Sequence, residues 1–210
     1  ISGFINCPIN KNLLDKKNMG LTEFFAKKCK IKKDSEVMLI KNKKISVSPI
    51  TTHINLRDVA KKINRKIIVK KIKTLHFWFK KFEKKTPRIC LLGLNPHNAE
   101  FKKNSEEEKI LIPIVKLLKK KGFKINGPTS ADTIFMHKFK KYDVIIGMYH
   151  DQVLAPFKAL YKFDAINITL GLKYLRVSPD HGIASDLICK KKANPNSLIN
   201  CIKFIEKYTK

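Results

Sequence analysis

Three histidines follow three apolar, strand-like segments of the chain. His53 comes after KISVSPITT, His97 after RICLLGLNP and His150 after YDVIIGMY. In open α/β sheets the loops at the carboxyl ends of the strands bind ligands, so these three imidazoles can face one point. Three histidines with an open fourth position are typical of a catalytic site for a divalent metal. A single histidine at a strand end is more often a hydrogen-bonded loop residue, and spacing alone leaves both interpretations open.

Asp151 stands directly beside His150 in the stretch GMYHDQ. A carboxylate in that position can orient a ligand imidazole or accept a proton, and a loop-capping role is equally compatible with it. The sequence contains no GxGxxG, GxxxxGK[ST], HExxH or GxSxG motif. The signatures of dinucleotide, P-loop, zincin and hydrolase sites therefore give no support to a different active site.

The segments that must position these residues alternate between strands and helices. A short helix is expected in NMGLTEFFAKKCK, and EVMLI with KISVSPITT predicts a hairpin whose tip is the charged stretch KNKK. The stretch HINLRDVAKKINRKIIVKKIKTLHFWFKKF carries one apolar stripe at helical spacing, with lysines on its other side. Asn55 and Asp58 stand where this helix is expected to start.

A further helix is expected after the strand RICLLGL. Ser105 and Glu108 form a capping box at its start, Pro113 should kink it and Gly122 should end it. The stretch SLINCIKFIEKY predicts a closing amphipathic helix. Strands that alternate with helices of this length predict a layered α/β sheet with a parallel component.

The composition is strongly basic. In 210 residues, 45 Lys and Arg stand against 17 Asp and Glu, which leaves a formal net charge of +28. Such a charge is also found in proteins that bind nucleic acid or anionic membranes. The lysines are spread along the whole chain beside many Asn and Ile residues, and this pattern favours a general compositional drift over a footprint for nucleic acid.

The cysteines and the apolar runs indicate a cytoplasmic protein. Five cysteines, an odd number with no CxxC spacing, lie mostly in apolar runs and are expected to be reduced thiols. No apolar run approaches the roughly 20 residues that span a bilayer. The first residue is Ile1 rather than Met, so we expect that an amino-terminal part is missing.

Six motifs occur together in an order and with separations that resemble those of the 4-hydroxythreonine-4-phosphate dehydrogenase family of vitamin B6 biosynthesis. They are TTHINLRD, GLNPHNAE, NGPTSADTIF, GMYHDQ, INITLGL and LRVSPDHG, and they span nearly the whole chain. The resemblance implies the α/β fold of isocitrate and isopropylmalate dehydrogenases, a two-lobed homodimer whose active site is shared between subunits. It implies a central lobe of approximately residues 1–150, which carries the histidines, and a segment 151–210 that returns to the other lobe.

The resemblance also implies an activity. Members of the family use NAD or NADP to oxidise 4-phosphooxy-L-threonine, and the product loses carbon dioxide to give 3-amino-2-oxopropyl phosphate. By the family pattern, a divalent metal (Zn, Mg, Co or Mn) is held by His53, His97 and His150, contributed from both subunits. The positions that match the substrate-binding residues are Thr22, Lys158, Asn167 and Arg176. Apart from the family pattern, Asp180 and His181 are side chains that can help to place the nicotinamide or adenosine part of the cofactor.

The chain departs from the family pattern at several positions. Leu21 replaces a histidine expected to contact the phosphate, Ile183 replaces a threonine, and Ala99 replaces a glycine. Ala99 should disfavour a backbone with positive φ. Two other interpretations therefore stay open at this point: a non-catalytic remnant of the enzyme, and a basic protein that associates with nucleic acid. We expect the phosphorylated hydroxy-amino acid and a second copy of the chain as partners, and no membrane.

Overall fold

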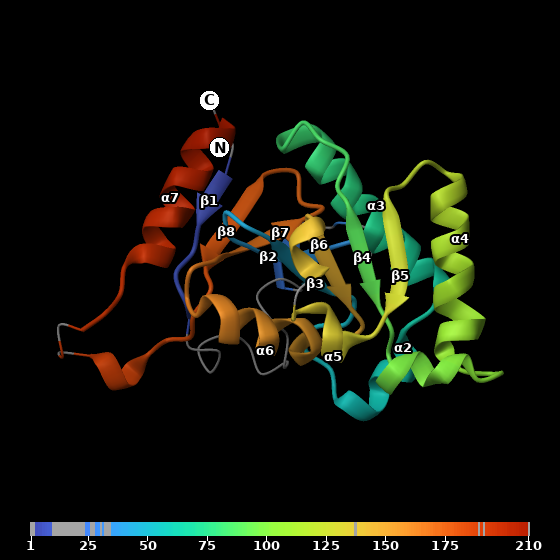
Figure 1. Ribbon diagram of the computed structural model, residues 1–210. Helices are drawn as coiled ribbons and strands as arrows, with labels where there is room; N and C mark the ends of the chain where they lie inside the picture. Colours follow the sequence, from blue (N-terminus) through green and yellow to red (C-terminus); the bar gives the residue numbers. More distant parts are fainter. Residues whose placement is uncertain are drawn as a thin grey trace.

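One mixed sheet of eight strands organises the chain (Figure 1). The computed structural model describes residues 3–9, 24–25, 28–29, 31, 35–136, 138–188, 190 and 192–209. The strand order is β1-β8-β7-β2-β3-β6-β4-β5. The strands are β1 (Gly3–Ile5), β2 (Val37–Lys41), β3 (Ser46–Pro49), β4 (Ile89–Leu92), β5 (Ile125–Thr129), β6 (Val144–Gly147), β7 (Ile166–Leu170) and β8 (Leu175–Pro179).

Four neighbouring strands run in parallel, and they determine where the site lies. β3 pairs with β6, β6 with β4 and β4 with β5, each in parallel. The carboxyl ends of β3, β4 and β6 therefore meet at one edge of the sheet, which we call the histidine edge. The α/β class with a parallel component, expected from the sequence, is confirmed.

The predicted hairpin is also confirmed. β2 and β3 pair antiparallel, with Ile40 opposite Val47. In the turn between them the Asn42 side chain accepts hydrogen bonds from the backbone N–H groups of Lys44 (2.8 Å) and Ile45 (2.9 Å). This turn lies at the edge of the sheet opposite the histidine edge, because β3 runs from the turn toward the histidines.

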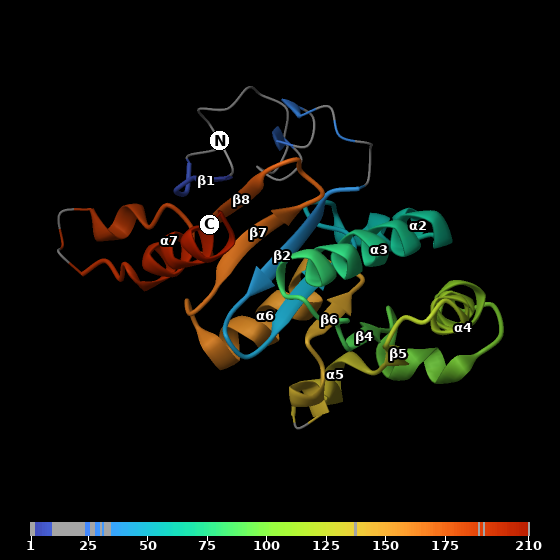
Figure 2. The same cartoon turned by 90° about the horizontal axis from the view of Figure 1, so that it is seen from above.

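Helices cover both faces of the sheet. The helical segments are η2 (Leu56–Asp58), α2 (Val59–Lys62), α3 (Arg65–Phe82), η3 (Pro96–Phe101), the π-type turn η4 (Glu107–Leu111), α4 (Ile112–Lys120), α5 (Ala131–Ile134), η5 (Lys138–Lys141), α6 (His150–Tyr161), η6 (Ser185–Leu187) and α7 (Asn196–Thr209). Seen from above, α7 lies beside β1 and β8 at one end of the sheet, and α4 lies beside β5 at the other (Figure 2).

Each face of the sheet has its own apolar core. Along β2, Val37 and Leu39 belong to the core under α3, α4 and α7, whereas Met38 and Ile40 belong to the core under α5 and α6. Alternate side chains of a strand point to opposite faces, so a strand covered on both sides reads as a continuous apolar run. Strands from residues 1–150 and from 151–210 lie in this one sheet, and a lobe boundary near residue 150 stays a prediction.

The long helix expected before Phe82 is interrupted, which corrects one prediction. The chain forms η2 and α2, becomes extended at Ile63 and Asn64, and only then enters α3. Asn64 caps α3, since its side chain accepts a hydrogen bond from the Ile67 N–H at 3.0 Å. Asn55, the predicted cap, makes no side-chain capping bond. The apolar spacing continues across the break, so periodicity alone did not reveal it.

The helix after β4 begins close to the predicted capping box. The N–H of Glu108 donates to the Ser105 Oγ at 3.3 Å, and the Glu108 carboxylate accepts from the N–H of Asn104 at 2.9 Å. Pro113 lies in the first turn of α4, directly after the π-type turn, instead of kinking the middle of a regular helix. Gly122 ends the helix with φ of 79°, as expected.

Two further findings concern membrane spans and the first part of the chain. Within the described residues, no helix is both long and apolar enough to cross a bilayer. The short helix expected in NMGLTEFFAKKCK falls largely outside the described residues.

The Asn64 cap makes a testable prediction. Asn64→Ala should lower the free energy of unfolding by about 1 kcal/mol, because the N–H of Ile67 loses its acceptor. Asn55→Ala is the matched control and should change it far less, since the Asn55 side chain caps nothing. Urea unfolding followed by circular dichroism measures both. Equal losses in the two variants would contradict the assignment of the cap.

Candidate functional site

Two of the three predicted metal ligands lie together at the histidine edge. The ring centres of His53 and His150 are 5.8 Å apart, with the rings tilted by 41°. His53 lies four residues after the end of β3, and His150 is the first residue of α6, three residues after the end of β6. The parallel pairing of β3 and β6 is what brings residues 97 positions apart in the sequence into contact.

Hydrogen bonds hold the two histidine loops against each other. Thr51 donates to the carbonyl oxygen of Met148 through both its Oγ1 (2.7 Å) and its backbone N–H (3.1 Å). Ile50 extends the ladder, because its N–H donates to the carbonyl of Gly147 at 2.8 Å. Thr51 is buried, so these bonds are protected from competition with water. The backbones that carry the two imidazoles are therefore held next to each other.

Asp151 contacts the ring of its neighbour. The Asp151 Oδ1 lies 2.6 Å from the His150 Nδ1. A carboxylate that accepts the Nδ1 proton leaves the lone pair on Nε2, which is the arrangement common among metal-binding histidines. This contact fits the orienting role considered for Asp151 from the sequence.

The donor set at this edge fits a divalent cation. Two imidazoles on one tetrahedral ion have ring centres about 5 Å apart, given metal–nitrogen distances of about 2.0–2.1 Å. The observed separation of His53 and His150 is close to this value. Among the residues that the structure describes, however, no three His, Cys, Asp or Glu side chains of one chain are grouped to hold a metal ion.

His97 lies on the neighbouring loop, after β4. Its side chain is 72% exposed, and its Nδ1 is 3.9 Å from the Asp132 Oδ2. The backbone of the segment from His97 to Phe101 is left-handed throughout, with φ between 48° and 56°. Ala99, where the family pattern has glycine, has φ of 50°. Position 99 thus has a positive φ although alanine, as stated from the sequence, disfavours it.

Glu107 holds the start of the His97 loop, and the sequence analysis missed it. This fully buried carboxylate accepts hydrogen bonds from the N–H groups of Leu94 (2.8 Å) and Asn95 (2.9 Å) and from the Asn95 side chain (2.9 Å). Burial acts to raise the pKa of Glu107, but these hydrogen bonds outweigh it and lower the pKa below its ordinary value. In the sequence Glu107 reads as one of three acids in a first helical turn, and nothing separates it from its neighbours.

Lys158 and Asp180 form an ion pair next to this region. The Lys158 Nζ lies 3.3 Å from the Asp180 Oδ2 and donates to the Asp180 carbonyl at 3.0 Å. Burial raises the pKa of Asp180, against the opposing effects of Lys158, His150 and His181. Lys158 lies in α6, the helix that begins with His150, and Asp180 directly follows β8, so the ion pair joins a predicted substrate residue to a predicted cofactor residue. His181 contacts the carbonyl of Gly182 through its Nδ1 at 2.8 Å.

The remaining predicted substrate residues lie on β7 and β8. The Oδ1 of Asn167 is buried and has no hydrogen-bond partner among the described residues. Arg176 is buried, and it donates to Asn6 Oδ1 (2.7 Å) and to Thr169 Oγ1 (3.0 Å). These two hydrogen bonds help to hold its guanidinium group in place. Thr22 and Leu21 lie outside the described residues.

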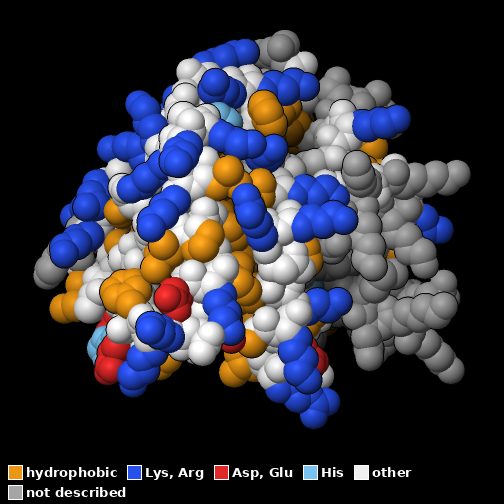
Figure 3. All heavy atoms as spheres, turned by 90° about the vertical axis from the view of Figure 1, so that its right-hand side faces the viewer, with side chains coloured by type: hydrophobic (Ala, Val, Ile, Leu, Met, Phe, Trp, Pro, Cys, Tyr) orange, Lys and Arg blue, Asp and Glu red, His pale blue; other side chains and the backbone are white. Residues whose placement is uncertain are grey.

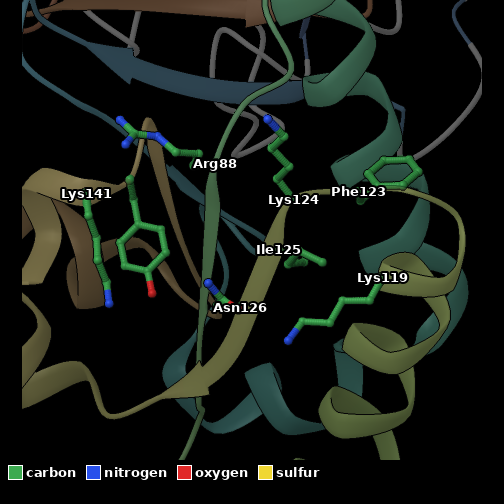
Figure 4. Close-up of a pocket in the computed structure, with 8 residues that line it drawn as sticks. Arg88, Lys119, Phe123, Lys124, Ile125, Asn126 and Lys141 are labelled. Atoms are coloured by element: carbon green, nitrogen blue, oxygen red, sulfur yellow. The ribbon is translucent and has the colours of Figure 1, made fainter.

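A basic cavity lies at the edge of the sheet opposite the histidine edge (Figure 4). It has a volume of about 550 Å³ and lies where β4, β5 and β6 begin. Arg88 is bonded to Asp143 (3.2 Å from Nε), which lowers the pKa of Asp143 to about 2 although burial opposes the shift. In Figure 4 the side chains of Arg88 and Lys124 extend away from those of Lys119 and Lys141. The cationic groups do not converge on one point, so the histidine edge is the better candidate.

The basic charge is dispersed over the face of the molecule that Figure 3 draws. Figure 3 shows Lys and Arg side chains scattered across the face that carries α3 and α4, with apolar side chains between them. A nucleic-acid interface more often gathers its basic groups in one stripe or patch. The distribution agrees with the compositional drift inferred from the sequence.

The comparison with known proteins decides the family. The sequence profile described as pyridoxal phosphate biosynthetic protein PdxA matches residues 1–205. The chain belongs to the PdxA family. The 4-hydroxythreonine-4-phosphate dehydrogenase of Sulfurihydrogenibium sp. is 39% identical to it over 204 residues, which cover 95% of this chain and 62% of that protein. The family resemblance stated from the sequence motifs is confirmed.

Solved structures support the same assignment. The crystal structure of the 4-hydroxythreonine-4-phosphate dehydrogenase from Klebsiella pneumoniae matches with a TM-score of 0.81 and 32% identity, covering 100% of this chain and 65% of that one. The isocitrate dehydrogenase of Methylococcus capsulatus matches with a TM-score of 0.60 at 12% identity, which confirms the predicted fold. This PdxA-family chain spans less than two thirds of the length of the Sulfurihydrogenibium and Klebsiella proteins.

The left-handed loop of this PdxA-family chain gives a prediction about Ala99. Ala99→Gly should raise the free energy of unfolding by about 0.5–1 kcal/mol. The left-handed conformation costs an L-residue about 1–2 kcal/mol, and the larger conformational entropy that glycine loses on folding offsets part of the gain. Ala155→Gly, within α6, is the control and should lower it by about 1 kcal/mol. Chemical denaturation measures both. A loss of stability in Ala99→Gly would contradict the positive φ.

The hydrogen bonds that Glu107 accepts from Leu94 and Asn95 give a prediction about how stability depends on pH. Because the pKa of Glu107 is lowered in the folded state, its contribution to stability is present above its ordinary pKa of 4.5 and is lost as the pH falls through the folded value. Glu107→Gln should therefore be less stable than the parent by about 2 kcal/mol at neutral pH, and the difference should shrink below pH 4.5. Unfolding curves at several pH values measure it. A difference independent of pH would contradict this role of the hydrogen bonds.

Proposed function

We propose that the full-length protein containing this chain is an NAD(P)-dependent dehydrogenase that oxidises 4-phosphooxy-L-threonine. The oxidised product loses carbon dioxide and leaves 3-amino-2-oxopropyl phosphate, a precursor for pyridoxal phosphate. The observation that carries the proposal is the family match over residues 1–205, with relatives that bear the name of this enzyme. The pairing of His53 with His150 at the histidine edge supports it.

His53, His97 and His150 are proposed to hold one divalent cation. When bound, such a cation (Zn, Mg, Co or Mn) makes a substrate hydroxyl easier to deprotonate and polarises a carbonyl. His53 and His150 offer two imidazoles at a suitable spacing, and Asp151 keeps the Nδ1 proton on His150 so that Nε2 is the free donor. Since the described part of one chain groups no three such side chains, we propose that the set is completed across two copies.

The substrate is proposed to lie between the histidine edge and the strands β7 and β8. Lys158 offers a cation for the phosphate or the carboxylate of the substrate, with Asp180 holding the ammonium group in place. The buried Oδ1 of Asn167 has no partner in the described part of the chain and can accept a hydrogen bond from an ammonium or hydroxyl group. Arg176 adds a buried positive charge on the neighbouring strand.

The hydride acceptor is proposed to be NAD or NADP. Asp180 and His181 are the residues proposed to lie near this cofactor, and they differ in burial and in their present contacts. Asp180 is buried and paired with Lys158, so its direct part is to position that lysine. His181 is less buried and lies beside Gly182, so it is the better candidate for contact with the cofactor.

The test measures both turnover and metal binding of the full-length protein. We expect NADH or NADPH to appear when 4-phosphooxy-L-threonine and a divalent metal are supplied. His97→Ala should weaken metal binding by more than about 100-fold, since loss of mere outer-shell partners already costs about 10–100-fold. The loss of turnover should follow the loss of metal.

The matched control is His76→Phe. His76 is buried in α3 and packs against Phe123, with ring centres 4.2 Å apart, far in the fold from the loop ends that carry the site. It should keep both metal binding and turnover. No turnover by a folded wild-type protein would leave the remnant interpretation standing, and steeply salt-dependent RNA binding would favour the nucleic-acid interpretation.

A further inference from the structure

Gln152 is the only glutamine in the chain, which otherwise uses asparagine for its side-chain amides. It lies in the first turn of α6, two residues after His150, and its side chain is partly buried. Neither the sequence motifs nor the proposed chemistry gives it a role. Its contacts nevertheless lie between the loops that carry the histidines.

The amide of Gln152 bridges two of these loops. Its Nε2 donates to the carbonyl of Gly93 at 2.7 Å, and its Oε1 accepts from the N–H of Met148 at 2.7 Å. Gly93 directly follows β4 and begins the loop that leads to His97, while Met148 directly follows β6 and leads to His150. A terminal amide can form such a bridge because its nitrogen donates while its oxygen accepts.

The third loop joins at the same residue. The carbonyl of Met148 accepts from the Oγ1 and the N–H of Thr51, two residues before His53. The N–H of Met148 therefore donates to Gln152, and its carbonyl accepts from Thr51. The glycine before it allows this close approach, because a Cβ on Gly147 would stand 2.9 Å from the Gln152 Oε1. The backbone of Met148 and the side chain of Gln152 together thus connect the loops of all three histidines.

We propose that Gln152 is a positioning residue that fixes the loops of His53, His97 and His150 relative to one another, with Thr51 as its partner through Met148. The inference rests on the proposed function, since a set spacing of the histidines matters for holding a cation. Gln152 acts through the backbone of Gly93 and Met148, and not by contact with substrate or metal. Its effect should therefore appear in metal affinity beyond any effect on stability.

The experiment compares the side-chain amides of Gln152 and Asn42, which each make two hydrogen bonds to the backbone. Gln152→Met removes both bonds at similar volume, and Asn42→Leu does the same in the hairpin turn at the opposite edge. In the metal-free full-length protein, calorimetric titration with Mn²⁺ and with Zn²⁺ gives the affinity, and urea unfolding gives the stability. We expect at least about 10-fold weaker metal binding in Gln152→Met, and wild-type affinity in Asn42→Leu at a similar loss of stability.

A second variant tests the role of Met148, and it keeps the inference testable if Gln152→Met does not fold. Thr51→Val removes only the hydroxyl bond to Met148 and should also weaken metal binding. In the double variant the losses should be smaller than the product of the two single losses, because both act through one residue. Wild-type affinity in folded Gln152→Met, or in Thr51→Val if the former does not fold, would overturn the inference. A wild-type protein that binds neither metal would overturn the proposed metal site and this inference with it.

Discussion

The site depends on the parallel pairing of β3, β6 and β4. Parallel neighbours end at the same edge, so three chain segments far apart in sequence leave the sheet side by side. The loops then need little more than a few hydrogen bonds to bring their side chains together. Thr51 and Gln152 supply these bonds on the two sides of Met148, while Glu107 fixes the third loop from the helix that follows it. The rigidity lies in the backbone, and the histidines project from it.

The sequence predicted the elements with strong patterns and missed those that depend on single contacts. Apolar runs bounded by turns indicated β2, β3 and β6, and Gly122 marked a helix end, because these signals are local. The break before α3 was missed because the apolar spacing runs through it, and Asn64 resembles any other polar residue of that stretch. Local patterns describe the elements well and describe their interruptions poorly.

The candidate site shows the same division. His150 and Asp151 are adjacent in the sequence, so their contact could be expected. Alanine in place of the family's glycine drew attention to the backbone at position 99, which has a positive φ in the structure. The partners of Glu107 and Gln152 are backbone groups of distant loops, which leave no trace in the spacing of side chains. The ion pair between Lys158 and Asp180 joins a helix to the end of β8, so it could not be predicted without knowing the fold. Prediction from sequence thus reached the groups that act and not those that support them.

The outer strand β5 affects whether a strand from another molecule can extend the sheet. It forms one end of the sheet in the described part of the chain, and it contains Gly127 and Pro128, with an irregular register against β4. Proline offers no amide hydrogen, so an incoming strand would find an incomplete ladder there. At the other end β1 has only three residues. Within the described part of the chain, both outer strands are therefore poor templates for a strand from another molecule, which opposes the continuous sheets of fibrous aggregates.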